Sequence, residues 1–500
     1  MKKICVIIGS GLGGLSCGYI LARNGYRVTV LEQGTQTGGC LQCFSRRGVP
    51  FETGMHFIGS ADRGQTLHRL LHYLEVDEHI ELSRLDTDGY DVISLQNERF
   101  PFANGKEAFV EQLGARFPRE KDNLVTYFDC IEQIAQASSL HSLRQAESDI
   151  AINTRYQTTS INDVLAEIIH DPLLRDVLVG NLPLYAAQKD RTPFATHAFI
   201  MDFYNQSAFR VVGGSNKIGT SLVDSIRQMG GEVLIRHKVV RMVCNETHIV
   251  GVETENGQYF PADIVISDTH PVRTLEILPD TKLIRPAFRQ RINQIPNTVA
   301  GFTVYLHFKR ERVPYMNSNF YAYHSDSPWN CESYTDDTWP KGYLYMHFCH
   351  QQQPQFAQSG VILSYMTMDE MKPWINTTVG HRGAEYEAFK QSKAEKLLEQ
   401  VEHEFPGLRS SIAHYYTSTP LTYRDYTGTH NGSMYGVVKD ITLGAACRVP
   451  HRTKIPNLLQ TGQNINSHGI LGVLVGTIVT CSALIGAETI YRQIVEAEQL

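Results

Sequence analysis

The sequence predicts an α/β protein in which a parallel-sheet, Rossmann-like domain is built from both ends of the chain and an α+β domain is inserted between them. Two observations support this prediction. A glycine-rich turn joins an apolar run to a helical segment at residues 4–24, and a second glycine-bearing loop follows an apolar run at residues 457–476. A chain of 500 residues has enough core for two or three domains.

The first expected element is a short buried strand. Residues 4–8, ICVII, are continuously apolar, which is typical of a strand covered on both faces. The glycines that follow have the spacing G-x-G-x-x-G; residues 15–24 then have a helical pattern, and residues 27–31 that of a second strand. Such a turn lets the backbone approach a pyrophosphate at the helix N-terminus. We therefore predict a dinucleotide site formed by Gly9, Ser10, Gly11, Leu12, Gly13 and Gly14.

An acid ends the second expected strand. Glu32 lies 18 residues after Gly14, where a carboxylate can accept hydrogen bonds from ribose hydroxyls. We expect Glu32 and the neighbouring Gln33 to line the site. The alternative is a glycine turn with a structural role only.

Two later segments indicate which dinucleotide is bound. Gly38 and Gly39 come just past the acid, and residues 457–476 place Thr461-Gly462 between an apolar strand and a helix rich in small residues. A nucleotide loop at each end of the chain indicates FAD, held between the two loops. The expected contacts in the second loop are Gly462, Gln463, Asn464, Ile470 and Gly472.

These motifs together resemble one superfamily. The N-terminal unit, the double glycine, FETG at 51–54 and TGQN at 461–464 are similar to those of the phytoene desaturase, carotenoid isomerase and retinol saturase flavoproteins. The likeness is closest to the retinol saturase branch, in which a GGC element runs into a motif like F-D-T-G-I-H-Y. Here GGCLQCF runs into FETGMHF, and residues 192–243 resemble the second nucleotide-domain segment of that family.

The resemblance implies an FAD-binding domain of the glutathione-reductase and amine-oxidase type, with an inserted α+β substrate domain. The FAD-binding domain would comprise residues 1–75, 205–272 and 440–500, and the substrate domain residues 76–204 and 273–439, the first of these helical in pattern. Aromatic-rich strands after residue 298 would line either an apolar cavity or a sheet core. The resemblance also implies FAD contacts at Gly39, Cys40, Gly54, Met55, His56, Val239 and Val240.

The pair Cys40 and Cys43 could be a redox dithiol or half of a metal site. A metal site needs a second ligand pair, and C-x-x-C does not recur in the sequence. Dithiol flavoenzymes also carry a nicotinamide-binding glycine loop. GGSNKIG at 213–219 lacks the required spacing and, we expect, a preceding buried strand. We therefore predict no metal, and we interpret the cysteines as packing residues along the flavin.

His56 is the candidate catalytic residue. The resemblance places it beside the flavin ring, where saturation of a C=C bond needs a proton as well as a hydride. The alternative is a histidine that only hydrogen-bonds the cofactor or a carbonyl. His468 and Tyr435 present the same choice between a chemical and a packing role.

Composition excludes several other classes. A net charge of −6 and a pI near 6.4 give no basic field, so nucleic acid is not an expected partner. Glycines break the N-terminal apolar run and no signal-peptide cleavage site follows, which favours a cytoplasmic protein; the ten scattered cysteines fit a reducing compartment. The apolar run from Gly469 is expected to be a buried helix rather than a membrane span. The family likeness implies peripheral membrane contact.

The sequence thus predicts an FAD-dependent oxidoreductase acting on CH–CH groups. It would saturate, or desaturate, a C=C bond of a hydrophobic polyene or isoprenoid such as retinol or a carotenoid, and the resemblance favours saturation. The expected electron donor is a quinol, a reduced protein or NAD(P)H. The alternatives are a redox-neutral carotenoid cis-trans isomerase, an FAD-dependent amine oxidase and a flavoprotein without catalytic activity.

Overall fold

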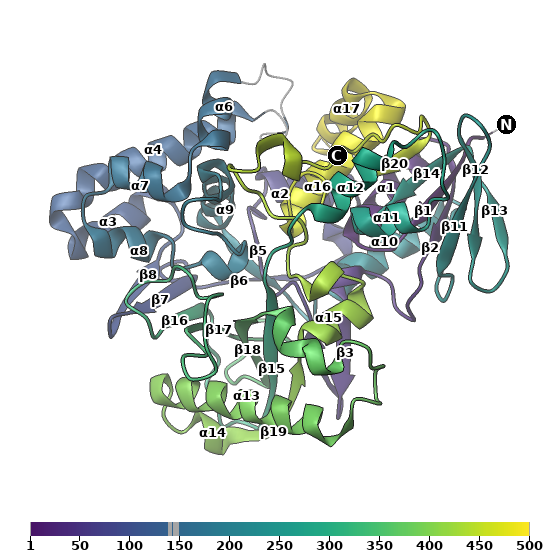
Figure 1. The fold of residues 1–500 in the computed structure, drawn as a ribbon. Helices are drawn as coiled ribbons and strands as arrows, with labels where there is room; N and C mark the ends of the chain where they lie inside the picture. The colour runs from purple at the N-terminus through teal and green to yellow at the C-terminus, as the bar shows by residue number, and fades with distance from the viewer. Residues whose placement is uncertain (1, 139–142, 144–149, 500) are drawn as a thin grey trace.

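A five-stranded parallel sheet joins the two ends of the chain in the computed structural model, which describes residues 2–138, 143 and 150–499 (Figure 1). The strands at residues 4–8 and 27–31 are confirmed, and the apolar run near residue 458 supplies the edge strand. The order of this sheet is β10 (Glu232–Leu234), β2 (Arg27–Leu31), β1 (Ile4–Ile8), β14 (Ile264–Ser267) and β20 (Leu458–Gln460).

Three helices pack around the sheet and place the glycine loops. They are α1 (Leu12–Arg23), α10 (Asn216–Gln228) and α16 (Gly469–Ile485), and α1 contacts both of the others. Helix α1 begins before the predicted residue 15 because Gly13 and Gly14 already lie in its first turn. Helix α16 is largely buried, which confirms the expected buried helix. Among the described residues, no helix combines the length and the apolarity that a bilayer crossing requires.

A small antiparallel sheet and four helices flank this core. The sheet consists of β11 (Val239–Cys244), β12 (Ile249–Thr254) and β13 (Tyr259–Pro261). Helix α17 packs on α2, while α11 packs on α12. The bounds of these helices are α2 (Thr66–Tyr73), α11 (Pro271–Glu276), α12 (Pro286–Gln294) and α17 (Ala487–Ala497).

A seven-stranded mixed sheet forms the second large layer. Its order is β19 (Ile412–Ser418), β15 (Ala300–Phe308), β18 (Ser359–Met366), β17 (Gly342–His347), β16 (Asn319–Tyr323), β7 (Asp91–Leu95) and β8 (Glu98–Phe102). Strand side chains alternate between faces. Phe302 and Val304 therefore pack with α13 (Gly383–Glu404), whereas Tyr305 faces Phe51 on the other side. The aromatic-rich strands thus form a sheet core.

Helices cover the far side of the molecule. The Ser160 hydroxyl oxygen caps the helix at Ile161–Ile168, because it accepts a hydrogen bond from the Asp163 N–H at 3.1 Å. The helical pattern expected for residues 76–204 is confirmed in part: helices α3 to α9 lie in that range, but so do β7 and β8, which join the large sheet. The helices are α3 (Lys106–Arg116), α4 (Lys121–Ala137), α6 (Ile150–Thr158), α7 (Ile161–Ile168), α8 (Pro172–Leu178) and α9 (Phe194–Gln206).

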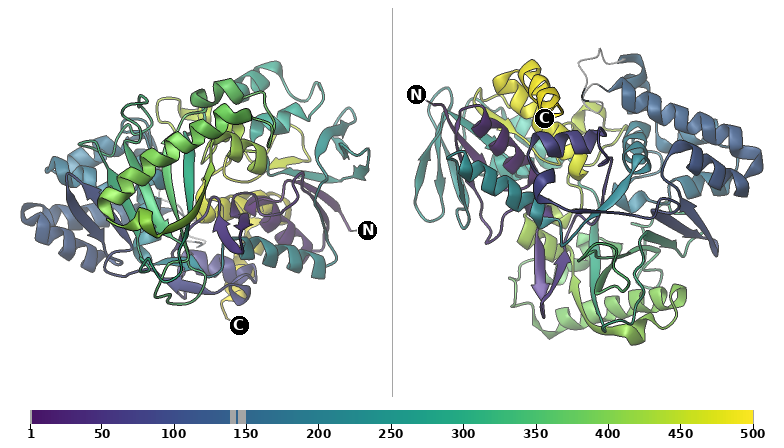
Figure 2. Two further views of the ribbon diagram at one scale, coloured as in Figure 1. Left: turned by 90° about the horizontal axis from the view of Figure 1, so that it is seen from below. Right: turned by 180° about the vertical axis from the view of Figure 1, so that it is seen from behind.

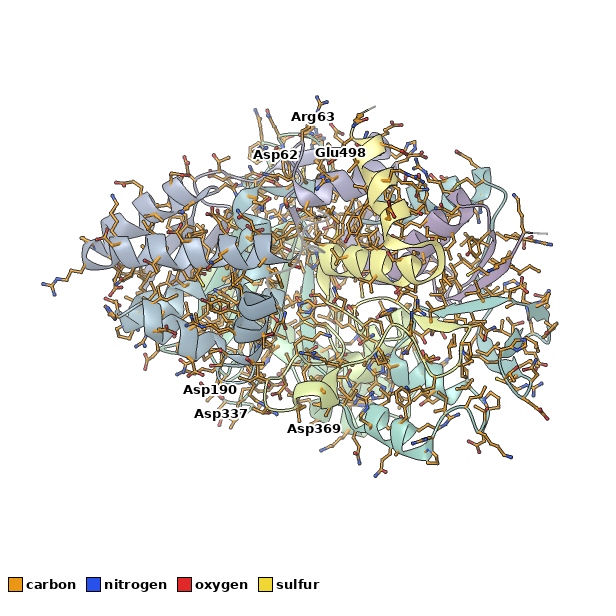
Figure 3. The ribbon with its side chains drawn as sticks, turned by 90° about the horizontal axis from the view of Figure 1, so that it is seen from above. Asp62, Arg63, Asp190, Asp337, Asp369 and Glu498 are labelled. Carbon is orange, nitrogen blue, oxygen red and sulfur yellow. The ribbon has the colours of Figure 1, made fainter. Side chains whose placement is uncertain are left out.

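Short strands connect the two large sheets. The hairpin of β3 (Cys43–Arg46) and β4 (Val49–Glu52) lies between them, and β9 (Ala208–Val211) pairs with β5 (Ile58–Gly59) and β6 (Leu82–Arg84). In the views from below and from behind, the parallel sheet lies apart from the α3–α9 helices and from α13 (Figure 2). At the outer edges lie exposed charges, with Glu498 and Asp62 at one edge and Asp190, Asp337 and Asp369 at the other (Figure 3). The domain boundaries given above remain a prediction.

Candidate functional site

The turn between β1 and α1 is built for a backbone that a ligand can approach. Gly9 has a φ of +99°, a conformation that favours glycine. A Cβ on Gly14 would lie 2.2 Å from the Gly9 carbonyl oxygen, and one on Gly13 would lie 2.8 Å from the Gly462 nitrogen. The first and last glycine loops of the chain therefore touch. Gly11 supplies the N-cap of α1, and no acid occupies the first turn of that helix.

The predicted ribose acid is held in place. The Glu32 carboxylate accepts hydrogen bonds from Ser10 Oγ at 2.6 Å, Ser10 N at 3.0 Å and Gly34 N at 2.7 Å. Gln33 is exposed and lies near Gly428, at the end of α15 (Pro420–Thr427). The carboxylate therefore lies beside the phosphate-binding turn, as a ribose ligand must.

The loop from residue 38 to residue 56 lies along the same turn. Gly38 donates its N–H to the Ser10 carbonyl at 2.8 Å, and a Cβ on Gly39 would lie 3.1 Å from the Gly11 Cα. A Cβ on Gly54 would lie 2.9 Å from the Cys40 carbonyl oxygen. Glycines therefore let residues 38–39 pack against the nucleotide turn and let Gly54 pack against Cys40 behind them. Met55 packs against the neighbouring core.

The two cysteines of this loop are free thiols. Burial raises the pKa of both Cys40 and Cys43 to about 11. Thiols with such pKa values are protonated at neutral pH and are poor nucleophiles. The part of the chain that the structure describes also contains no cluster of three or more histidine, cysteine or acidic residues suited to a metal.

The strand that carries the expected FAD contacts Val239 and Val240 begins close to Glu32. The Glu32 N–H donates to the Leu234 carbonyl at 2.8 Å, and the Glu32 carbonyl accepts from the His237 N–H at 2.7 Å. Val239 is buried, whereas the side chain of Val240 is 42% exposed. The alternation of the strand thus directs the two side chains to opposite faces.

The second loop is braced from several sides. Thr461 donates its N–H to the Ser267 carbonyl at 3.0 Å, and Asn464 Oδ1 accepts from the Val437 N–H at 3.0 Å. Gln463 is half-buried and Ile470 is buried, while a Cβ on Gly472 would lie 2.6 Å from the Ser467 Cβ. The amide of Asn464 is therefore a brace for residues 436–437.

His468 and Tyr435 lie side by side, with ring centroids 4.5 Å apart. Burial lowers the pKa of His468 to about 3, so the ring is neutral at physiological pH. The Tyr435 hydroxyl donates to the Pro183 carbonyl at 2.7 Å, and burial raises its pKa. The packing interpretation therefore suits both residues.

His56 has a different environment. Its side chain is 8% exposed, its Nδ1 lies 3.6 Å from Glu52 Oε2, and neither ring nitrogen has a hydrogen-bond partner. The ring lies 5.8 Å from Phe348, centroid to centroid. The buried Arg210 guanidinium fixes the backbone by donating to the His56 carbonyl at 3.2 Å.

Asp268 is a residue of this site that the sequence analysis missed. It follows β14, and its Oδ1 would lie 2.7 Å from a Cβ on Gly13. Burial raises its pKa to about 7; the nearby Glu32 raises it further, while the N–H groups of Gly14 and Gly11 lower it in part. The sequence could have indicated Asp268, because it directly follows an apolar strand and the carboxyl ends of parallel strands meet at one edge of the sheet.

The expectation about residues 213–219 needs one correction. A buried strand, β9, does precede Gly213. It pairs antiparallel with β5 and β6, so it belongs to no βαβ unit. The segment therefore still lacks the parallel-sheet context of a nicotinamide-binding loop.

The crowded glycines, the fixed Glu32 and the contact between the two glycine loops fit a dinucleotide at this edge of the sheet. The parallel sheet and the two glycine loops define an FAD-dependent oxidoreductase. The chain belongs to the family of flavin-containing amine oxidoreductases, because the sequence model of that family matches residues 12–468.

Similarity to individual proteins extends over nearly the whole chain. The all-trans-retinol 13,14-reductase of Rattus norvegicus is 27% identical over 97% of this chain and 86% of its own length. Prolycopene isomerase 1 of an Oncidium hybrid is 23% identical over 97% of this chain and 84% of its own. The crystal structure of an oxidoreductase from Methanosarcina mazei has a TM-score of 0.66 at 14% identity and covers 96% of this chain and 100% of its own. This last likeness concerns the fold.

Proposed function

We propose that this enzyme saturates a C=C bond of a hydrophobic polyene or isoprenoid alcohol or hydrocarbon. The observation that carries the proposal is the end-to-end similarity to all-trans-retinol 13,14-reductases, in a chain whose two proposed FAD loops contact each other. FAD, when bound and reduced, supplies the hydride for one carbon of the double bond. The other carbon requires a proton, which the chain must provide.

His56 is the proposed proton donor. Its ring nitrogens are buried without hydrogen-bond partners, so an N–H remains available to a substrate. The N–H bond breaks as the new C–H bond forms, and the saturated product leaves with two added hydrogens. The Arg210 contact to the His56 carbonyl keeps the backbone fixed while the proton moves.

The apolar wall for the substrate is proposed to lie between Tyr435 and a small cavity lined by Leu182, Tyr323 and Tyr365. Tyr435 connects the second FAD loop to that wall through its hydrogen bond to Pro183. Peripheral contact with a membrane, part of the same proposal, is supported by the exposed side chains of Ile375, Val379 and Tyr426.

The electrons are proposed to arrive from a quinol, a reduced protein or NAD(P)H. A cis-trans isomerase is the second candidate, because similarity to prolycopene isomerases also covers nearly the whole chain. It would leave the substrate mass unchanged. The contacts around His56 do not by themselves distinguish these two reactions.

The deciding experiment is anaerobic. The holoenzyme is reduced chemically and mixed with all-trans-retinol or with lycopene, while flavin absorbance and product mass are followed together. Reoxidation with a gain of two hydrogens supports the saturase. An altered isomer pattern at unchanged mass, with the flavin still reduced, replaces it with the isomerase.

The role of His56 is tested in the same assay with His56→Gln. We expect retained FAD absorbance and reoxidation slower by about 100-fold, the usual contribution of a general acid. The matched control is His79→Gln, a substitution at an exposed histidine outside the predicted FAD loops. Equal rates for His56→Gln and wild type would remove His56 from the mechanism.

A further inference from the structure

A buried carboxylate beside His56 has no place in the function proposed so far. Glu52 ends β4, and its side chain is 8% exposed. Its Oε1 accepts a hydrogen bond from the Ser215 N–H at 2.9 Å. Ser215 is the N-cap of α10, so the carboxylate lies at the positive end of a helix of 13 residues. A backbone N–H donor and the positive end of a helix dipole therefore both face this carboxylate.

A small cavity adjoins the same carboxylate. Glu52, Gly213, Gly214, Phe348 and His350 are among its lining residues, and its volume is about 10 Å³, room for roughly one water molecule. A water there would solvate the acid without opening the site. Glu52 therefore has both a fixed backbone donor and a route to solvation, although almost none of its surface is exposed.

Other titratable groups surround Glu52 and His56, among them Lys217, whose Nζ would lie 2.9 Å from a Cβ on Gly213 in the cavity lining. Burial raises the pKa of the Cys43 thiol to about 11 and lowers that of His350 to about 4. The Arg210 guanidinium bonds to the His56 backbone carbonyl, to the Ser318 carbonyl and to Asn319. Glu52 is thus the charged group placed to act on the His56 ring, from 3.6 Å.

We propose that Glu52 is a positioning residue for the proton donor: its carboxylate pairs with the Nδ1–H of His56, holds the ring as an imidazolium and leaves Nε2–H for transfer to the substrate. The inference rests on the proposed function. In the transfer the Nε2–H bond breaks and a C–H bond forms, which leaves a neutral ring still bonded to Glu52 through Nδ1–H. Nε2 regains its proton from solvent before the next turnover. The gap of 3.6 Å is expected to shorten to a hydrogen bond in the substrate complex.

The test is Glu52→Gln in single-turnover reoxidation of the chemically reduced holoenzyme by the substrate that wild type reduces, over a range of pH. Glutamine keeps the shape of the side chain but removes the charge. We expect the alkaline fall in rate to begin about one pH unit lower than in wild type, with a rate about tenfold lower near pH 8. Glu52→Asp should restore part of the alkaline range, since it keeps the charge.

His79→Gln is again the control, because His79 is exposed and lies outside the cavity lining, so this variant should leave the pH profile unchanged. An unshifted profile for Glu52→Gln, or an equal loss of rate at every pH, would overturn the role of Glu52 and leave the proposed function standing. No reduction of any polyene by wild type would instead overturn the proposed function. A normal rate for His56→Gln would show that His56 is not the proton donor, and the role proposed for Glu52 would then fail as well.

Discussion

Asp268 offers the sharpest test of how the nucleotide loops are held together. Its carboxyl lies between the first and last glycine loops, and its pKa is raised to about 7 by burial and by the nearby Glu32. The ordinary aspartate value is 3.8. Asp268→Asn keeps the size and one carbonyl oxygen while it removes the titration.

The direction in which pH changes the free energy of unfolding follows from proton binding. Between about pH 4 and pH 7 the folded apoprotein holds a proton that the unfolded chain releases, so this group makes the free energy of unfolding fall as pH rises. The shift of about 3 pKa units corresponds to about 4 kcal/mol at 1.36 kcal/mol per unit. Because the side chain is half-buried, solvent screening reduces this to about 2 kcal/mol.

The assay is thermal unfolding of FAD-free wild type and variant at about pH 5 and about pH 8. We expect the variant to gain several degrees relative to wild type at the higher pH and little at the lower one. Asp263→Asn, at the exposed start of the same strand, is the control and should show no such dependence. An identical difference between wild type and Asp268→Asn at both pH values would refute the reasoning.

Two further substitutions test the contact between the glycine loops and the hydrogen bonds of the buried Arg210. Gly13→Ala should abolish FAD binding, measured by flavin absorbance after purification, because its Cβ would meet the Gly462 nitrogen at 2.8 Å; retained FAD would show that the loops can separate. Arg210→Met should lower the free energy of unfolding by about 3 kcal/mol, measured by denaturant unfolding, since it leaves the His56 and Ser318 carbonyls and Asn319 Oδ1 without their donor. A loss below about 1 kcal/mol would show that these acceptors find other partners.

The nucleotide half of the fold could be predicted because its rules are local. An apolar strand, three spaced glycines and an acid at a fixed distance define β1, α1 and Glu32 within 29 residues, from Ile4 to Glu32. The same reasoning found β20 and α16 at the other end of the chain.

Pairing between distant segments could not be predicted in the same way. Strand β7 pairs in parallel with β16, more than 200 residues later, so no local pattern shows that Asp91 belongs to the large sheet. The contact of Glu52 with Ser215 and the position of Asp268 depend on similar long-range packing. Sequence motifs therefore located the cofactor loops, while the charged groups that act on them required the three-dimensional structure.

The contact between Gly13 and Gly462 has a consequence for biosynthesis. A ribosome makes the first half of the nucleotide cradle at once, but the second half emerges only after some 450 further residues. Strand β1 can pair with β2 at once, but it must wait for β14, its other neighbour, and β14 must wait for the edge strand β20. A chain interrupted before Gly462 therefore lacks the second loop, which contacts Gly13 in the folded protein.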